Sequence, residues 1–248
     1  MNWIQKYAKN SKTHWQWYKD FFQLAIFRYL ITWFAIVPVF AKLLSKIPYE
    51  VPIRTSNGFE MILTLALPFH WQLLWLSSLF FVIAFFLYKI FCPNFIIKYP
   101  NFYKYLDHNH SPRWMVWEAA EVIKTRSEIS KFIDRLSKKQ YIKEEKFYLV
   151  NEIKPEVENK QTILKFNFND RTYSLGMPII KNDEVAENLT LIAEKEIFWE
   201  IFGRFASSHY KIRVLISILL LLSSAAFGVV LIENIWAGLL YFFKWIYL

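Results

Sequence analysis

Three long apolar blocks, separated by polar sequence, constrain this chain more than any other feature. They cover residues 21–44 (FFQLAIFRYLITWFAIVPVFAKLL), 73–91 (LLWLSSLFFVIAFFLYKIF) and 214–232 (VLISILLLLSSAAFGVVLI). An α-helix rises 1.5 Å per residue, so each block has close to the roughly 20 residues that cross about 30 Å of hydrocarbon. A helix on the core of a soluble protein carries a polar stripe, and these blocks carry almost none. The sequence therefore predicts three transmembrane helices.

The polar sequence between the second and third blocks is long enough for one small folded domain. We expect an α-helical multi-pass membrane protein with an inserted small cytoplasmic α+β domain. Its predicted parts are a basic aromatic interfacial segment (1–20), a transmembrane hairpin (21–92), the α+β domain (93–212), and a third transmembrane helix with a tail (213–248). The tail is predicted to lie in the outer interface, and the alternative is a short fourth span after a turn at Glu233–Asn234.

The distribution of charge predicts the orientation. The chain carries a formal net charge of +9, but residues 93–212 hold 19 Lys and Arg against 17 Asp and Glu. The remaining excess of Lys and Arg residues flanks the apolar blocks. These residues interact with anionic lipid headgroups and keep the flanking segments on the cytoplasmic side. We therefore expect a protein of the cytoplasmic membrane, in contact with the lipid bilayer, with the amino terminus and the central domain in the cytoplasm. The loop 45–71 then faces outward, and binding to nucleic acid is not expected.

Polar and small residues inside the predicted spans are candidates for function or packing. Arg28 lies about two turns into the first block, where a charged residue is either functional or extends to the headgroups. In the third block, Ser217, Ser224 and Gly228 recur at helical spacing. Small residues allow close approach of helices in lipid, so these three predict helix packing. Their partner is either another span of the same chain or a second copy, and we expect a homo-oligomer.

The sequence of the central domain predicts two helices, several strands and a final helix. Ser111-Pro112 and the capping-box pattern at 125–128 mark the two helix starts. The segment 161–176 predicts a β-hairpin with Asn169–Asp170 at the turn. In that register Phe166 faces Tyr173 and Leu164 faces Leu175, whereas Lys165, Asn167, Thr172 and Ser174 lie on the other face. The remaining predicted elements are a strand at 147–153 and a long helix at about 183–208.

The same order of elements also describes a winged helix. In that alternative, DNA phosphates would be contacted by Lys131, Arg135, Lys138 and Lys139. The nearly neutral charge of the domain and its attachment to the membrane argue against this alternative.

Two histidines form the one cluster with metal-binding spacing. Asp107, His108 and His110 precede the first predicted helix of the domain, and two histidines with a carboxylate can bind a divalent metal. The alternative is a polar run before a helix, where Asp, Asn and Ser are common because they hydrogen-bond to the backbone. No other cofactor is predicted.

No phosphate-binding loop, nucleophile elbow or zinc-protease motif occurs in the sequence. The leading hypothesis is therefore a non-enzymatic membrane protein whose cytoplasmic domain binds a partner protein or a small ligand. Its helices would oligomerise as a platform or as a membrane-permeabilising effector with a toxin-like or defence role. The alternatives are a membrane-bound metal-dependent enzyme that uses Asp107, His108 and His110, and an ion channel lined by the first span.

Overall fold

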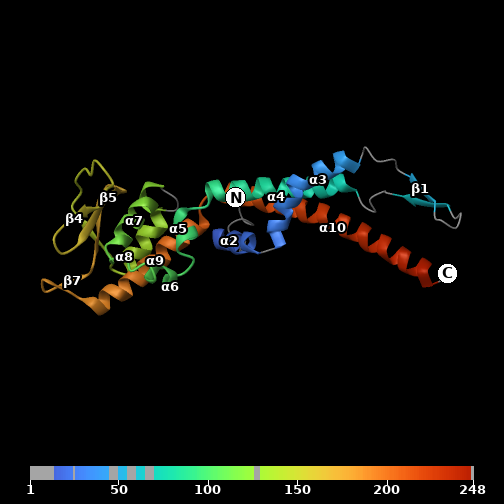
Figure 1. Cartoon of the computed structure of the whole chain (residues 1–248). Coiled ribbons are helices and arrows are strands. Elements are labelled where there is room, and N and C mark those ends of the chain that lie inside the picture. Colours follow the sequence, from blue (N-terminus) through green and yellow to red (C-terminus); the bar gives the residue numbers. More distant parts are fainter. Residues whose placement is uncertain are drawn as a thin grey trace. The chain divides into compact units, whose positions relative to one another are not determined.

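The computed structural model describes residues 14–24, 26–44, 50–54, 60–64, 70–125 and 129–246. The protein is mostly helical, with small antiparallel sheets. The chain divides into two compact units, one formed by residues 1–19 and 92–210 and the other by residues 20–91 and 211–248. Figure 1 labels most of their helices and some of their strands. The longer polar stretch of the chain and the apolar blocks thus fall in different units.

The apolar unit is built on three helices, α3 (Ile26–Leu44), α4 (Trp71–Phe91) and α10 (Tyr210–Ile246). Within the described residues, α4 and residues 210–240 of α10 are long and apolar enough to cross a membrane. These two helices contain the second and third predicted spans. The first predicted span remains a prediction, although most of it forms α3.

Helices α4 and α10 pack in an antiparallel direction along seams that repeat every three and four residues. Most buried positions follow that spacing: Leu74, Ser77, Phe81, Ala84 and Tyr88 on α4, where Ser78 is buried as well, and Arg213, Ile216, Leu220, Ser223 and Val230 on α10. Phe81 and Tyr88 also contact the ring of Phe22. Such spacing keeps one face of a helix toward its neighbour. Ser77 and Ser223 meet on these seams, and each hydroxyl donates to the backbone carbonyl of the other residue, at 2.8 and 2.9 Å. Both hydroxyl groups are thereby satisfied away from water.

Helix α3 joins this pair through a small apolar cluster. Val37 is buried with Leu74 and Val230, and the ring of Phe34 stacks on Trp75 with centroids 5.9 Å apart. At the same end, both carboxylate oxygens of Glu233 accept hydrogen bonds from His70, one from its backbone N–H (3.0 Å) and one from Nδ1 (2.7 Å).

Three features of this unit differ from the sequence-based expectations. The first apolar block is divided between α2 (Trp15–Gln23) and α3. Helix α10 runs through Glu233–Asn234 without a turn, so the third span and the tail form one helix of 37 residues, about 55 Å long. The expected outer loop contains an unpredicted hairpin of β1 (Glu50–Arg54) and β2 (Glu60–Thr64). The remaining residues of that loop, 45–49, 55–59 and 65–69, lie outside the described residues.

The second unit has a four-stranded antiparallel sheet packed against helices. The strand order is β3-β6-β5-β4. The strands are β3 (Ile142–Glu145), β4 (Glu156–Val157), β5 (Thr162–Phe168) and β6 (Arg171–Met177), followed by the short pair β7 (Ile180–Lys181) and β8 (Glu184–Val185). The helices are α5 (Asn94–Lys98), α6 (Phe102–Leu106), α7 (Trp114–Lys124), α8 (Ile129–Lys138) and α9 (Glu187–Ser207).

The predicted hairpin is confirmed in its turn and in its register. Phe166 pairs with Tyr173 and Leu164 with Leu175, and Asn169 and Asp170 both have positive φ, 48° and 56°. Such a turn matches the twist of the two strands, and Asn and Asp tolerate it better than most residues. Phe166 and Leu164 are fully buried against the helices. The alternation of apolar and polar residues therefore specified which face of the sheet packs on the core.

The predicted strand at 147–153 is wrong, because that segment crosses the other face of the hairpin. Tyr148 donates its N–H to Thr172 Oγ1 at 3.1 Å, and its carbonyl accepts from Asn167 Nδ2 at 2.9 Å. The adjacent edge of β6 is occupied by β3. This crossing also explains why Thr172 is buried although its face of the hairpin is polar.

The predicted helices of the domain are present with shifted starts. Helix α7 begins at Trp114, whose N–H donates to the carbonyl of Ser111 at 2.8 Å, rather than being capped by a serine side chain. The capping box at 125–128 lies mostly outside the described residues, and α8 follows at Ile129. The last helix, α9, begins a few residues later than predicted.

The start of α2 belongs to the same unit as the domain. Trp15 and Tyr18 are fully buried, and Trp15 Nε1 donates to the carbonyl of Ser208 at 3.0 Å. Lys19 Nζ donates to the carbonyls of Ile96 (3.2 Å) and Ile97 (2.8 Å), in the last turn of α5. A cation at a helix C-terminus is stabilised by the helix dipole, so Lys19 holds α2 against α5. Residues 1–13 of the expected interfacial segment lie outside the described residues.

Candidate functional site

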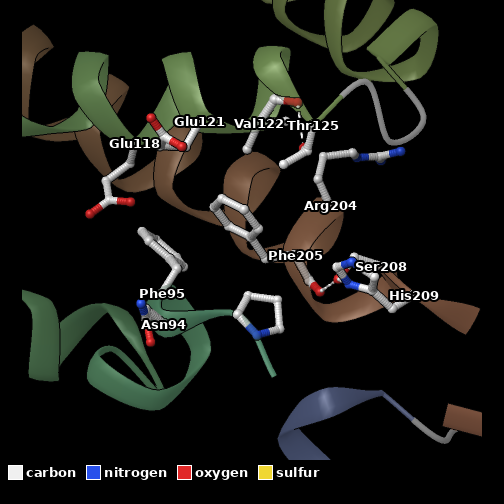
Figure 2. Close-up of a pocket in the computed structure, with 11 residues that line it drawn as sticks. Asn94, Phe95, Glu118, Glu121, Val122, Thr125, Arg204, Phe205, Ser208 and His209 are labelled. Carbon is white, nitrogen blue, oxygen red and sulfur yellow. Dashed lines mark hydrogen bonds between the residues drawn. The ribbon is translucent and has the colours of Figure 1, made fainter. Parts of the chain in front are cut away.

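A pocket of about 480 Å³ lies among α5, α7 and the end of α9 (Figure 2). We call it the α7–α9 pocket. Its lining comprises Pro93, Asn94, Phe95, Glu118, Glu121, Val122, Thr125, Arg204, Phe205, Ser208 and His209. This volume is within the range of small-molecule sites, which combine apolar walls with a few polar groups.

Two aromatic rings and two carboxylates give the α7–α9 pocket its chemical character. Phe95 and Phe205 lie with ring centroids 5.4 Å apart and form an apolar wall. Glu118 and Glu121 lie one turn apart on α7 and both line the pocket; Figure 2 labels them. Burial, with the nearby Glu121 as a smaller cause, raises the pKa of the Glu118 carboxyl. A carboxyl in such a setting binds a proton or a cationic group more readily than one in water.

His209 completes the pocket at the point where α9 gives way to α10. Its backbone has φ 49°, in the left-handed region that residues other than glycine seldom adopt. Its Nδ1 lies 3.2 Å from Ser208 Oγ, and that hydroxyl donates to the carbonyl of Phe205 at 2.8 Å. The extended backbone of Ser208 (φ −65°, ψ 163°) ends α9, and His209 lies between it and the first residue of α10.

The α7–α9 pocket is covalently close to both membrane-length helices. Pro93 and Asn94 follow the end of α4 at Phe91 within three residues. Ser208 and His209 immediately precede α10, which begins at Tyr210. Two segments of the pocket wall are therefore continuous in sequence with α4 and α10.

The predicted metal ligands lie beside the pocket, in an aromatic stack. The rings of His108 and His110 stack with centroids 5.5 Å apart, and His110 stacks on Trp114 at 4.9 Å. His110 Nε2 lies 2.9 Å from the hydroxyl of Tyr99. Burial, followed by the nearby His108 and Lys98, lowers the pKa of His110. The neutral ring is thus favoured, and it packs as an aromatic residue.

The structure does not bring Asp107 together with the two histidines as a ligand set. Asp107 ends α6, and its carboxylate accepts a hydrogen bond from Lys104 Nζ at 2.9 Å. Within the part of the chain that the structure describes, no group of three or more His, Cys, Asp or Glu side chains could hold a metal ion. The proposed metal site therefore rests on sequence spacing alone.

The histidine stack and the pocket are connected along α7. Trp114, which stacks on His110, donates its Nε1 hydrogen to Glu118 Oε1 at 3.0 Å. Burial, and then the charge of Glu118, raises the pKa of Tyr99. Protonation of Glu118 would change its hydrogen bond with Trp114, and Trp114 stacks on His110.

Comparisons with protein families, with curated proteins and with solved structures found no match to this chain. Function must therefore be argued from the geometry of the site.

The remaining predicted site residues are not drawn into the pocket. Arg28 lies in α3, and its side chain is outside the described part of the structure. Ser217 is half-buried, Ser224 is exposed, and a Cβ atom added to Gly228 would meet no atom within 4 Å. Within the described chain, α10 packs on α4 through Ser223, one residue away from the predicted position. Packing by Ser217, Ser224 and Gly228, against another span of the same chain or against a second copy, remains a prediction.

Sequence reasoning missed the residues that form the pocket. Glu118 and Glu121 carried a weak signal, because they are two carboxylates one turn apart on an otherwise apolar segment, WMVWEAAEVIK. Phe95 and Phe205 carried none, because aromatic residues are common throughout this chain.

Proposed function

We propose that this protein is a non-enzymatic, multi-pass protein of the cytoplasmic membrane that responds to a small ligand. Its cytoplasmic domain receives the ligand in the α7–α9 pocket. Its membrane helices then oligomerise, as a platform or as a membrane-permeabilising effector. Three spans, with the amino terminus and the domain in the cytoplasm, are part of this proposal, as is a partner protein on the cytoplasmic side.

One observation carries the proposal: the pocket wall includes the residues that follow α4 and those that precede α10. Two apolar helices of membrane length support attachment to the bilayer. The positive φ of His209 supports a response, because a sparsely populated backbone conformation next to a pocket is readily altered by a ligand. The pocket itself fits a compact ligand with an apolar body and a hydrogen-bonding or cationic group that faces Glu118.

Dye release from lipid vesicles tests this proposal. The full chain is reconstituted, and the low-mass filtrate of the cells that express it is added. Thr125→Trp fills the pocket from its exposed rim, whereas Ser137→Trp places the same side chain at an exposed position of α8, outside the lining. We expect the filtrate to cause dye release with the wild-type chain and with Ser137→Trp, and not with Thr125→Trp. The proposed response is wrong if the filtrate acts equally on all three proteins or on none.

Membrane attachment is tested separately. We expect the chain to remain in membranes washed with alkaline carbonate, because apolar spans are held by the hydrocarbon core. Light scattering of the detergent-solubilised protein then measures its oligomeric state with and without the filtrate. A strict monomer under both conditions would contradict the oligomeric part of the proposal.

A further inference from the structure

The outer face of the four-stranded sheet, opposite the helical core, carries a row of polar residues in register. Ser174 of β6 pairs with Lys143 of β3 on one side and with Lys165 of β5 on the other. Residues paired across antiparallel strands project to the same face, so the three side chains form one row. The neighbouring row on the core face, Ile142, Leu175 and Leu164, is buried. The polar row therefore lies on the side of the sheet away from the core.

This row borders a broad groove of about 1040 Å³ on that face. Ser174 and Gly176 contribute small residues from the central strand, and Gln161 lies beside them. A Cβ atom built on Gly176 would lie 3.0 Å from Gln161 Nε2, a contact that requires Gln161 to move. The glycine thus leaves room for the Gln161 side chain to lie against β6, where it forms part of the groove wall.

The charge of the row favours a bound anion. Neighbouring strands are about 4.8 Å apart, so the Cα atoms of Lys143 and Lys165 lie about 10 Å apart, on either side of Ser174. Lysine side chains can reach over such a distance toward one shared anion. In the described part of the chain, no acidic side chain forms an ion pair with either lysine. The two ammonium groups are therefore available on the same face.

The lining of the groove also contains acidic residues. Glu145, Glu158 and Asp183 line it together with Lys160 and Lys181. Lys160 is held by Asp183, with its Nζ 2.9 Å from the carbonyl and 3.8 Å from the carboxylate. These acidic residues disfavour a long chain of phosphates, whereas one compact phosphorylated group can bind between the two lysines of the row.

We propose that this groove binds a phosphorylated small molecule of the nucleotide class. The phosphate would lie over Ser174 between Lys143 and Lys165, because lysine binds phosphate as a point charge. The organic part would lie on the apolar end of the groove, formed by Ile163, Pro178 and Ile179. This site shares no residue with the α7–α9 pocket, so its failure would leave the proposed function untouched.

Titration calorimetry on the full chain in an uncharged detergent tests the proposal. The probes are ATP, inorganic pyrophosphate and a short-chain phosphatidylglycerol. We expect ATP to bind more tightly than pyrophosphate, because the apolar end of the groove contributes to the affinity. Binding of the lipid alone would assign the groove to a lipid headgroup and overturn the proposal. The proposal also fails if ATP shows no binding up to about 1 mM, the weak end of specific affinities.

Matched variants distinguish the contribution of the two lysines of the row from the effect of the overall charge on ATP affinity. Lys143→Gln with Lys165→Gln removes the row and should weaken ATP binding at least about ten-fold, since each charged hydrogen bond contributes about 1.5 kcal/mol or more. Lys138→Gln with Lys195→Gln removes the same charge from exposed helix positions and should leave the affinity unchanged. Equal weakening by both pairs would show a non-specific charge effect and overturn the proposal. Gly176→Ala should also weaken ATP binding, with circular dichroism confirming that the fold is retained.

Discussion

Replacement of Tyr105 by phenylalanine tests how the interior of the domain tolerates a buried carboxylate. Tyr105 is 0% exposed and Glu194 is 3% exposed, and the tyrosine hydroxyl donates to Glu194 Oε1 at 2.8 Å. Tyr105→Phe removes one hydroxyl without changing the shape of the ring. Water has little access to take its place, so the carboxylate loses a donor.

The expected cost follows from the type of bond. Hydrogen bonds to charged groups contribute about 1.5–3 kcal/mol, so Tyr105→Phe should lower the free energy of unfolding by about 2 kcal/mol. For a domain of this size, that loss corresponds to a decrease in Tm of roughly 6–10 °C. Tryptophan fluorescence of the full chain in detergent measures the unfolding transition. Tyr103→Phe is the matched control, because Tyr103 is 77% exposed and its hydroxyl is in water.

The same variant makes a prediction about pH. Burial raises the pKa of Glu194, and the hydrogen bond from Tyr105 lowers it in part. A carboxyl whose folded pKa is raised binds more protons in the folded state, so stability falls as pH rises from the unfolded pKa, about 4.3, through the raised folded pKa. Without Tyr105 the folded pKa rises further. The cost of Tyr105→Phe should therefore be larger at neutral pH than near pH 4, and Glu194→Gln should abolish this difference.

A loss of stability in Tyr105→Phe as small as that in Tyr103→Phe would contradict a stabilising hydrogen bond to Glu194. An equal loss for Tyr105→Phe at acidic and neutral pH would show that the bond does not involve a titrating carboxylate.

Three further predictions concern the core, the helix pair and the orientation. Phe166→Ala should lower the free energy of unfolding by about 3–5 kcal/mol because its ring is fully buried. Phe147→Ala, at a position 55% exposed, should change it by less than about 0.5 kcal/mol. Equal shifts in Tm for the two variants would contradict this assignment of the core. Ser223→Leu should lower the Tm in detergent because the larger side chain overpacks the contact with α4, whereas Ser224→Leu on the exposed face should not. A larger decrease in Tm for Ser224→Leu than for Ser223→Leu would show that the seam is misplaced. A cysteine introduced as Asn169→Cys should react with a membrane-impermeant maleimide only after the cells are opened; labelling of intact cells would place the domain outside.

Local chemistry made the hairpin predictable. The residues of 161–176 alternate in polarity, and Asn169–Asp170 supports the positive φ angles that the turn requires. Neither property depends on the rest of the chain. The same holds for α4, whose apolar length alone makes it a candidate membrane span. By contrast, the sequence also predicts a strand at 147–153, and in the structure that segment forms none because β3 occupies the adjacent edge of β6.

The α7–α9 pocket could not be found from sequence because it combines three distant segments. Phe95, Glu118 and Phe205 become neighbours only when α5, α7 and α9 pack together. For the histidine pair, the spacing in the sequence suggested a shared site, whereas tertiary packing gives the side chains other contacts. The sequence placed His108 and His110 within reach of one ion, and the structure packs their rings in a stack with Trp114 while Lys104 holds Asp107.

The sequence by itself determined what depends on neighbours along the chain: apolar helices of membrane length, the turn and register of the hairpin, and the polarity of each face of that hairpin. Only the tertiary structure decided which residues meet across elements. On α10 the buried serine is Ser223 rather than Ser224, because one residue turns a helix by about 100° and the direction of α4 selects the face that packs. Residue spacing constrains which positions share a face, and packing alone determines what that face contacts.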